Sequence, residues 1–115
     1  MSARPLALVV EDDLDQLALL RRYLDREGFD VFAAVDAESA ISAFPEIRPR
    51  VAVLDLLLPG ISGHECARRV REAFPECFLV ISSVLDAAAY PSADAALPKP
   101  VVGASLRQLL ESIAR

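Results

Sequence analysis

Short, almost continuous apolar runs alternate along the chain with segments in which apolar residues recur every three or four positions. The apolar runs lie at residues 6–10, 31–35, 51–54 and 78–81, with a weaker run at 95–97. Runs this short and this apolar are typical of strands that are covered on both faces. The pattern therefore predicts five buried β-strands.

Amphipathic helices are predicted between most of these strands and after the last one. Apolar residues recur at helical spacing over residues 14–24, 37–44, 67–74 and 106–113. Gly28, Pro45 and Pro75 are expected to end the first three helices. Strands joined through helices run parallel with right-handed crossovers, so we expect a doubly wound α/β fold with a five-stranded parallel sheet.

Composition agrees with a single folded domain. The chain has 115 residues, of which 54% are hydrophobic and 25% charged, which is enough apolar material for one core and too little length for two. We therefore expect one domain over residues 1–115. No apolar run approaches the roughly 18 residues that a membrane span needs, and no signal peptide is evident, so we expect a cytoplasmic protein without a membrane partner.

Charge and cysteine usage narrow the function classes further. The net charge of −5 opposes direct binding to a nucleic-acid backbone. Cys66, Cys77 and the single histidine, His64, do not have the spacing of a metal site. We expect both cysteines to be reduced residues that pack in the core.

Polar residues lie at the carboxyl ends of four of the predicted strands. These residues are Glu11, Asp12 and Asp13 after the first strand, Asp55 after the third, Ser82 and Ser83 after the fourth, and Lys99 after the fifth. In doubly wound sheets, ligands bind beyond the carboxyl ends of the strands. If these strands are neighbours, clustered carboxylates would repel one another unless a hard cation lay between them, and oxygen ligands suit Mg²⁺. The lysine would then face a second anion.

Four segments in this order resemble the successive signatures of the receiver domain of two-component response regulators. They are VVEDD at 9–13, VLDLLLPGISG at 53–63, VISS at 80–83 and LPKP at 97–100. Each is weak alone, but together they are specific and extend over nearly the whole chain. The resemblance implies a flavodoxin-like sheet in the order 2-1-3-4-5. It also implies transfer of a phosphoryl group from a histidine kinase or histidine phosphotransfer protein to Asp55.

The resemblance also assigns roles to individual residues. Asp55 would be the nucleophile, and as a carboxylate it needs no deprotonation near neutral pH. Mg²⁺ would be bound by Asp12 and Asp55, by Glu11 through water, and by the backbone carbonyl of Leu57.

Lys99 would pair with a phosphoryl oxygen and offset charge in the transition state. The Lys99–Pro100 bond resembles the cis peptide of the family. The hydroxyl that binds the phosphoryl group is either Ser82 or Ser83. Ser82 is favoured, because a small residue follows it, whereas the bulkier Val84 follows Ser83.

Simpler interpretations of these residues remain open. Asp13 is expected to be a helix N-cap, with Gln16 completing a capping box, rather than a third acidic ligand. Glu11 and Asp12 alone are compatible with solvated turn acids. Lys99 alone is compatible with a surface lysine.

The chain departs from the family pattern between the fourth and fifth strands. Only residues 83–98 separate Ser82 from Lys99, which is fewer than is usual in the family. Pro91 follows closely, so the fourth helix of the family is expected to be shortened or lost. The family often carries an aromatic switch residue three positions before the lysine, where this chain has Ala96. Tyr90 is a candidate substitute, although nothing in the sequence requires it.

These features indicate one leading function and two alternatives. The leading one is a phosphoacceptor switch that catalyses only its own phosphorylation and dephosphorylation, without an output domain in this chain. The alternative is an adaptor that binds a partner independently of phosphate. A phosphohydrolase is disfavoured, because Leu57 stands where such enzymes have a second aspartate. The family usually binds its output partner through a face built from the fourth helix, the fifth strand and the fifth helix, and that face is expected to be reduced here. The first helix, with Arg21, Arg22 and Arg26, is then either a partner surface or a solvated helix face. The sequence does not identify the downstream partner.

Overall fold

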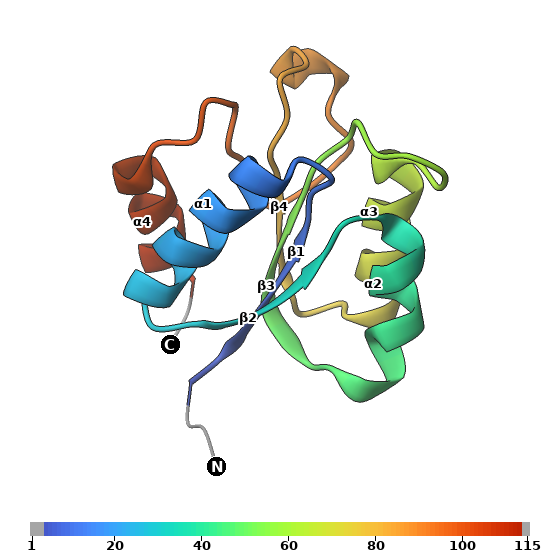
Figure 1. Ribbon diagram of the computed structural model, residues 1–115, viewed down its shortest axis with the longest axis horizontal. Coiled ribbons are helices and arrows are strands. Elements are labelled where there is room, and N and C mark those ends of the chain that lie inside the picture. Colours follow the sequence, from blue (N-terminus) through green and yellow to red (C-terminus); the bar gives the residue numbers. More distant parts are fainter. Residues whose placement is uncertain (1–3, 114–115) are drawn as a thin grey trace.

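The computed structural model describes residues 4–113, in which one parallel sheet lies between two layers of helices (Figure 1). The strands are β1 (Leu6–Val10), β2 (Asp30–Ala34), β3 (Pro49–Leu54), β4 (Phe78–Ile81) and β5 (Ala95–Ala96). Their order in the sheet is β2-β1-β3-β4-β5, and every neighbouring pair is parallel. The predicted fold class and strand order are confirmed.

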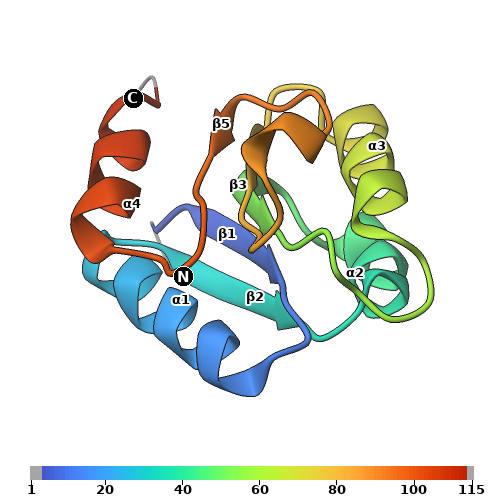
Figure 2. The ribbon, with the colours of Figure 1, turned by 90° about the horizontal axis from the view of Figure 1, so that it is seen from above.

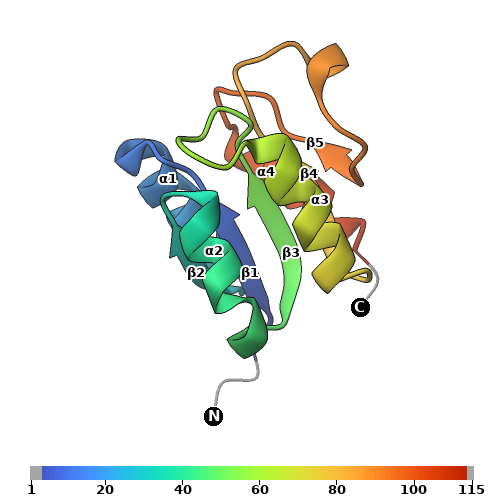
Figure 3. The same ribbon diagram turned by 90° about the vertical axis from the view of Figure 1, so that its right-hand side faces the viewer.

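Helices cover both faces of this sheet (Figures 1 and 3). They are α1 (Leu14–Arg26), α2 (Ala37–Ala43), α3 (Gly63–Ala73) and α4 (Gly103–Glu111), with two short 3₁₀ helices, η1 (Phe44–Glu46) and η2 (Ala87–Ala89). One buried cluster joins the sheet to α1 and α4, and a second joins it to α2 and α3. Neighbouring strand residues alternate between the clusters, as Leu8 and Val9 do, which explains the nearly continuous apolar runs in the sequence.

Several element boundaries differ by one or more residues from the sequence-based prediction. β2 ends one residue earlier than expected, at Ala34, which is the last residue to pair with β1. Val35 therefore lies outside the strand and is 42% exposed. Pro45 lies inside η1, because the missing N–H of proline is not needed in the first turn of a helix.

The segment between β4 and β5, residues 84–94, is here called the connector. In the part of the chain that the structure describes, η2 is its only helical turn, which confirms the predicted loss of a full helix at this place. The Asp86 side chain accepts the N–H of Ala88 at 3.0 Å. Leu85, Tyr90 and Ala93 pack against the α2 and α3 cluster. These three side chains cover part of the sheet that a longer helix would otherwise cover.

Both cysteines are buried and free, as predicted. Burial raises the pKa of Cys66 to about 11 and that of Cys77 to about 12. Their thiols therefore stay protonated near neutral pH and act as packing groups. Between residues 4 and 113, no helix has both the length and the apolar character needed to cross a membrane.

Candidate functional site

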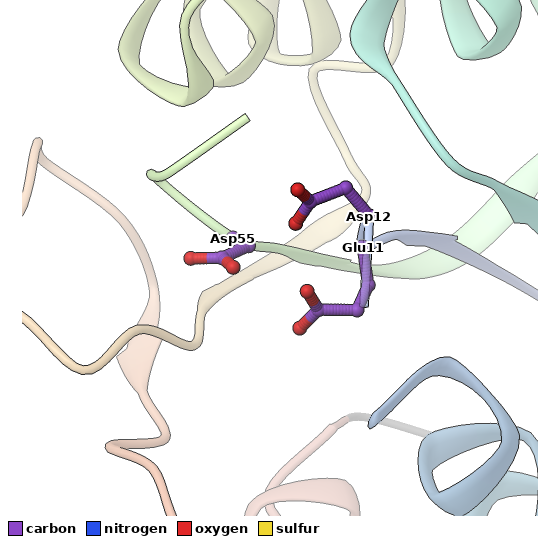
Figure 4. Close-up of side chains that lie close together, drawn as sticks. All are labelled: Glu11, Asp12 and Asp55. Atoms are coloured by element: carbon purple, nitrogen blue, oxygen red, sulfur yellow. The ribbon is translucent and has the colours of Figure 1, made fainter. Parts of the chain in front are cut away.

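The acidic residues predicted from the strand ends meet at the carboxyl edge of the sheet. The pairing of β1 with its neighbours continues one residue past the strand, since the Asp55 N–H donates to the Val10 carbonyl at 3.0 Å. Glu11, Asp12 and Asp55 each present a carboxylate oxygen, and these three oxygens lie within 4.8 Å of one another. Figure 4 shows the three carboxylates directed toward a common space. The sequence-based prediction that these groups converge is confirmed.

Burial makes this cluster electrostatically costly. Glu11 is 1% exposed and Asp55 is 5% exposed, whereas Asp12 is open to solvent. Burial raises the pKa of the Glu11 carboxyl, and the nearby charge of Asp55 acts in the same direction, although Lys99 opposes both. Negative charge at this site is therefore only partly compensated by the protein, and a cation among the three oxygens would complete the compensation.

Lys99 reaches the cluster from the segment that follows β5. Its Nζ atom lies 2.5 Å from Glu11 Oε1 and 2.9 Å from Asp55 Oδ2. Burial disfavours the charged form of Lys99, but its hydrogen bonds to Glu11 and Asp55 and the attraction of their charges together outweigh burial and raise its pKa. The ammonium group thus stays charged beside Asp55. The Lys99–Pro100 peptide bond is cis, as the resemblance implies.

The loop after β3 holds the Asp55 carboxylate in place. The Leu57 N–H donates to Asp55 Oδ1 at 3.1 Å, which keeps the backbone of Leu57 next to the carboxylate. Farther along, the Ile61 N–H donates to Glu38 Oε2 at 3.0 Å, and Ser62 caps α3 by accepting the Glu65 N–H. Sequence reasoning missed Glu38, because no local pattern connects α2 to a loop about two dozen residues away.

Gly63 is the first residue of α3 and lies directly against the backbone of Asp55. A Cβ atom at this position would overlap the Asp55 carbonyl oxygen and the Leu56 Cα atom. Gly60, by contrast, has a φ of +70° and is a true turn glycine. Gly63 is therefore needed for the close approach of α3 to Asp55, and not for the turn.

Ser82 and Ser83 are both buried, but their hydroxyls have different surroundings. The Ser82 N–H donates to the Leu54 carbonyl at 2.9 Å, which places Ser82 beside Asp55 in the sheet. Among residues 4–113, Ser82 Oγ finds no hydrogen-bond partner, whereas Ser83 Oγ accepts the Leu85 N–H at 3.3 Å. A buried hydroxyl without a partner costs free energy, so Ser82 Oγ is the group that a ligand could satisfy.

Asp13 caps α1, as predicted, and lies apart from the cluster. Its side chain accepts the N–H groups of Asp15 and Gln16, both at 3.0 Å. The predicted capping box is incomplete, because the Asp13 N–H donates to Glu11 Oε2 at 3.2 Å and Gln16 Oε1 has no hydrogen-bond partner in the described chain. Glu11 therefore accepts the N–H of the N-cap residue, which is the role expected of Gln16.

Comparisons with known proteins agree with this geometry. The family model described as "Response regulator receiver domain" matches residues 7–111. The Transcriptional regulatory protein PrrA of Mycobacterium tuberculosis is 38% identical over 117 residues, an alignment that covers 96% of this chain and 50% of PrrA. The chain thus spans about half the length of this curated relative.

Solved structures show the same architecture. A response regulator receiver domain from Methylobacillus flagellatus superposes with a TM-score of 0.86 at 26% identity, covering 97% of this chain and 100% of that one. The response regulator protein TrrA from Thermotoga maritima, solved in complex with Mg²⁺ and BeF, has a TM-score of 0.86 at 24% identity, covering 96% and 99% of the two chains.

Proposed function

The chain belongs to the response regulator receiver domain family, and we propose that it is a phosphorylation-dependent switch whose Asp55 accepts a phosphoryl group from the phosphohistidine of a histidine kinase or histidine phosphotransfer protein. The observation that carries the proposal is the convergence of Glu11, Asp12, Asp55 and Lys99 at one edge of the sheet. An adaptor that works without phosphate would not need this set of mutually repelling, partly buried acids.

In the proposed reaction, Asp55 is the nucleophile. One of its carboxylate oxygens forms the new P–O bond while the P–N bond of the donor breaks, and the electron pair of that bond returns to the donor imidazole nitrogen. The ammonium group of Lys99, 2.9 Å from Asp55 Oδ2, is placed to pair with a phosphoryl oxygen. Because Lys99 is held by Glu11 as well, it is positioned before the phosphoryl group arrives.

The acidic cluster fits a divalent cation of the Mg²⁺ type. Asp12 and Asp55 would hold the ion directly and Glu11 would hold it through a water, since their hard carboxylate oxygens lie within 4.8 Å of one another. Asp12 is exposed, so the site is open to water and to phosphoryl oxygens. The Leu57 carbonyl is the further ligand that we propose. When bound, Mg²⁺ would neutralise charge on the transferring group. Ser82 Oγ, which is buried beside Asp55 and has no partner among residues 4–113, is the hydroxyl that we assign to the phosphoryl group, in preference to Ser83.

Incubation of the protein with acetyl phosphate and Mg²⁺, followed by intact mass spectrometry, tests this function directly. We expect the mass to rise by a single phosphoryl group. A protein that stays unmodified under these conditions, while a known receiver is labelled in parallel, would contradict the proposal.

Mg²⁺ should stabilise the folded protein. A ligand that binds only the native state adds about 2.7 kcal/mol to the free energy of unfolding at 100 times its Kd. Asp12→Ala should abolish this effect and stabilise the metal-free protein by up to about 0.5 kcal/mol, because it removes one of the clustered like charges. Thermal melting with and without Mg²⁺ measures both effects. The control is Glu46→Ala in η1, which removes an exposed charge and should keep the full response to Mg²⁺.

The acyl phosphate should be long-lived. Hydrolysis needs a polar group that orients water at the phosphorus, but the rim residues Leu57 and Val84 are apolar and are 50% and 67% exposed. Leu57→Asn should therefore speed the loss of phosphate by about tenfold, or about 1.4 kcal/mol of barrier. The decay of the phosphorylated mass with time measures this rate, and Leu57→Met, which stays apolar, should decay as the parent does.

The first helix is the proposed contact for the phosphodonor. Arg21, Arg22 and Arg26 are exposed, and within residues 4–113 none of them forms an ion pair, so they stand free on an otherwise acidic chain. Arg21→Glu with Arg22→Glu should weaken binding of a histidine kinase by about tenfold at low ionic strength. If the affinity falls instead only with changes at Arg107 and Gln108 on α4, the arginines of α1 are a solvated face.

The proposed phosphoacceptor function also limits the catalytic activity and the location of the protein. The chain would catalyse only its own phosphorylation and dephosphorylation, in the cytoplasm. The output partner is a protein, not nucleic acid bound by this domain, because the net charge is −5.

A further inference from the structure

The hydroxyl of Tyr90 holds the backbone of Ser83 on both sides. It accepts the Ser83 N–H at 3.2 Å and donates to the Ser83 carbonyl at 2.8 Å. Tyr90 belongs to the connector, and its half-buried ring packs against the α2 and α3 cluster. The connector therefore reaches the end of β4 through a polar contact with the backbone and not only through apolar packing.

The backbone of Ser83 is connected to two residues of the site, Ser82 and Lys99. Ser82, whose hydroxyl has no partner in the described part of the chain, precedes it directly. The Ser83 carbonyl, which Tyr90 occupies, also accepts the Lys99 N–H at 3.1 Å. A shift of this one residue would move both Ser82 and the backbone that carries the Lys99 ammonium relative to Asp55.

Removal of the Tyr90 hydroxyl would leave this residue poorly held. Ser83 is fully buried, and within residues 4–113 the Tyr90 hydroxyl is the partner of its N–H. A buried N–H without a partner is costly, so the chain would adjust locally to satisfy it. The connector is also held at a second place, where His64 Nε2 lies 3.2 Å from the Ala89 carbonyl (Figure 2 shows the connector on the same side as α3). The loss of one hydroxyl should thus disturb the site without releasing the connector.

We propose that Tyr90 is a positioning residue, which aligns Ser82 Oγ and Lys99 Nζ with Asp55 by holding Ser83 through its hydroxyl. This inference rests on the proposed phosphorylation of Asp55. Energetic coupling is reciprocal, so a phosphoryl group that engages Ser82 and Lys99 also changes the environment of Tyr90. Phosphorylation of Asp55 therefore changes the contacts of Tyr90 in the connector.

The test compares Tyr90→Phe with its parent in the rate of phosphorylation by acetyl phosphate at saturating Mg²⁺. We expect the rate to fall by about fivefold, which is the typical net worth of one hydrogen bond. In a Ser82→Ala background, the same change should lower the rate by less than about twofold, because part of what Tyr90 positions is already gone. The control is Tyr23→Phe on α1, which should react as the parent does.

A spectroscopic measurement separates positioning from a purely structural role. The chain has two tyrosines and no tryptophan, so Tyr90 is the only fluorescent residue of this kind in the Tyr23→Phe protein. We expect its emission to change when Mg²⁺ and beryllium fluoride are added together, and to stay constant with either alone or in an Asp55→Asn variant. This measurement does not require the Tyr90→Phe protein to fold.

The outcomes are distinct. Three results would overturn the positioning role while leaving the phosphoacceptor function in place, provided that the parent is phosphorylated. Tyr90→Phe could react at the parent's rate, or it could lower the rate by the same factor in the Ser82→Ala background as in the parent. Alternatively, the emission of Tyr90 could stay unchanged when Mg²⁺ and beryllium fluoride are added. If the parent is neither phosphorylated nor affected by beryllium fluoride, both proposals fail together.

Discussion

Asp55→Asn should leave the protein folded and unable to accept a phosphoryl group. The amide has nearly the volume of the carboxylate, but its oxygen is a poor nucleophile and carries no charge. The other acids of the site cannot replace it, because Glu11 is held by Lys99 and by the Asp13 N–H, and Asp12 is exposed at the rim. Intact mass spectrometry after incubation with acetyl phosphate and Mg²⁺ measures the result, with circular dichroism as the check on folding.

Phosphorylation of Asp55 should also depend on a divalent cation. Chelation by EDTA should slow the labelling of the parent by about 100-fold or more, because a phosphoryl group would otherwise bring further negative charge to a cluster that Lys99 only partly compensates. Glu46→Ala should be labelled as the parent is. Labelling that persists in Asp55→Asn, or that is equal with and without EDTA, would show that Asp55 is not the acceptor.

Gly63→Ala should have the largest effect on stability. The added methyl group would meet the backbone of Asp55 and Leu56, which is part of the sheet edge and cannot rotate away as a side chain can. We expect a loss of about 2–3 kcal/mol in the free energy of unfolding, which is typical of overpacking against rigid atoms. If α3 moves instead, Asp55 is displaced, and a misplacement of about 1 Å can cost about 100-fold in rate.

Gly28→Ala is the matched control for this prediction. Gly28 has a φ of +93°, but apart from its two chain neighbours no atom of residues 4–113 lies within 4 Å of the position that a Cβ would take. The substitution should therefore cost only the backbone strain, about 1 kcal/mol, and leave phosphorylation unchanged. Urea denaturation of the two variants compares these costs. Equal losses at Gly63 and Gly28 would show that close packing against Asp55 is not what requires Gly63.

Much of the fold and of the chemical site could be predicted from local pattern. The apolar runs predict buried strands because helices cover both faces of the sheet. Leu8 and Val9, for example, belong to the clusters on opposite faces, and both are fully buried. Asp55 could be identified because it directly follows β3, and Lys99 because it lies on the short segment after β5. The carboxyl ends of parallel strands meet at one edge of the sheet. The shortened connector was predictable because fewer residues separate Ser82 from Lys99 than is usual in the family, and because Pro91 interrupts them.

Other features could not be predicted, because they depend on contacts between distant segments. The sequence did not indicate that Glu38 holds the loop after β3, or that Gly63 lies against Asp55. The part of the capping box expected from Gln16 was wrong, because Glu11 turns back toward the Asp13 N–H while it binds Lys99.

The sequence by itself thus determined the order of elements, the class of sheet and the identity of the charged groups, since these follow from periodicity and from which residues end each strand. The tertiary structure alone decided which groups touch. Side-chain direction, burial and the choice of partner depend on how β1, β3, β4 and the connector pack together, and local pattern carries no information about that packing. The hydrogen bonds between Tyr90 and Ser83 exist only in the folded chain, and so does the buried Ser82 hydroxyl, which has no partner among residues 4–113.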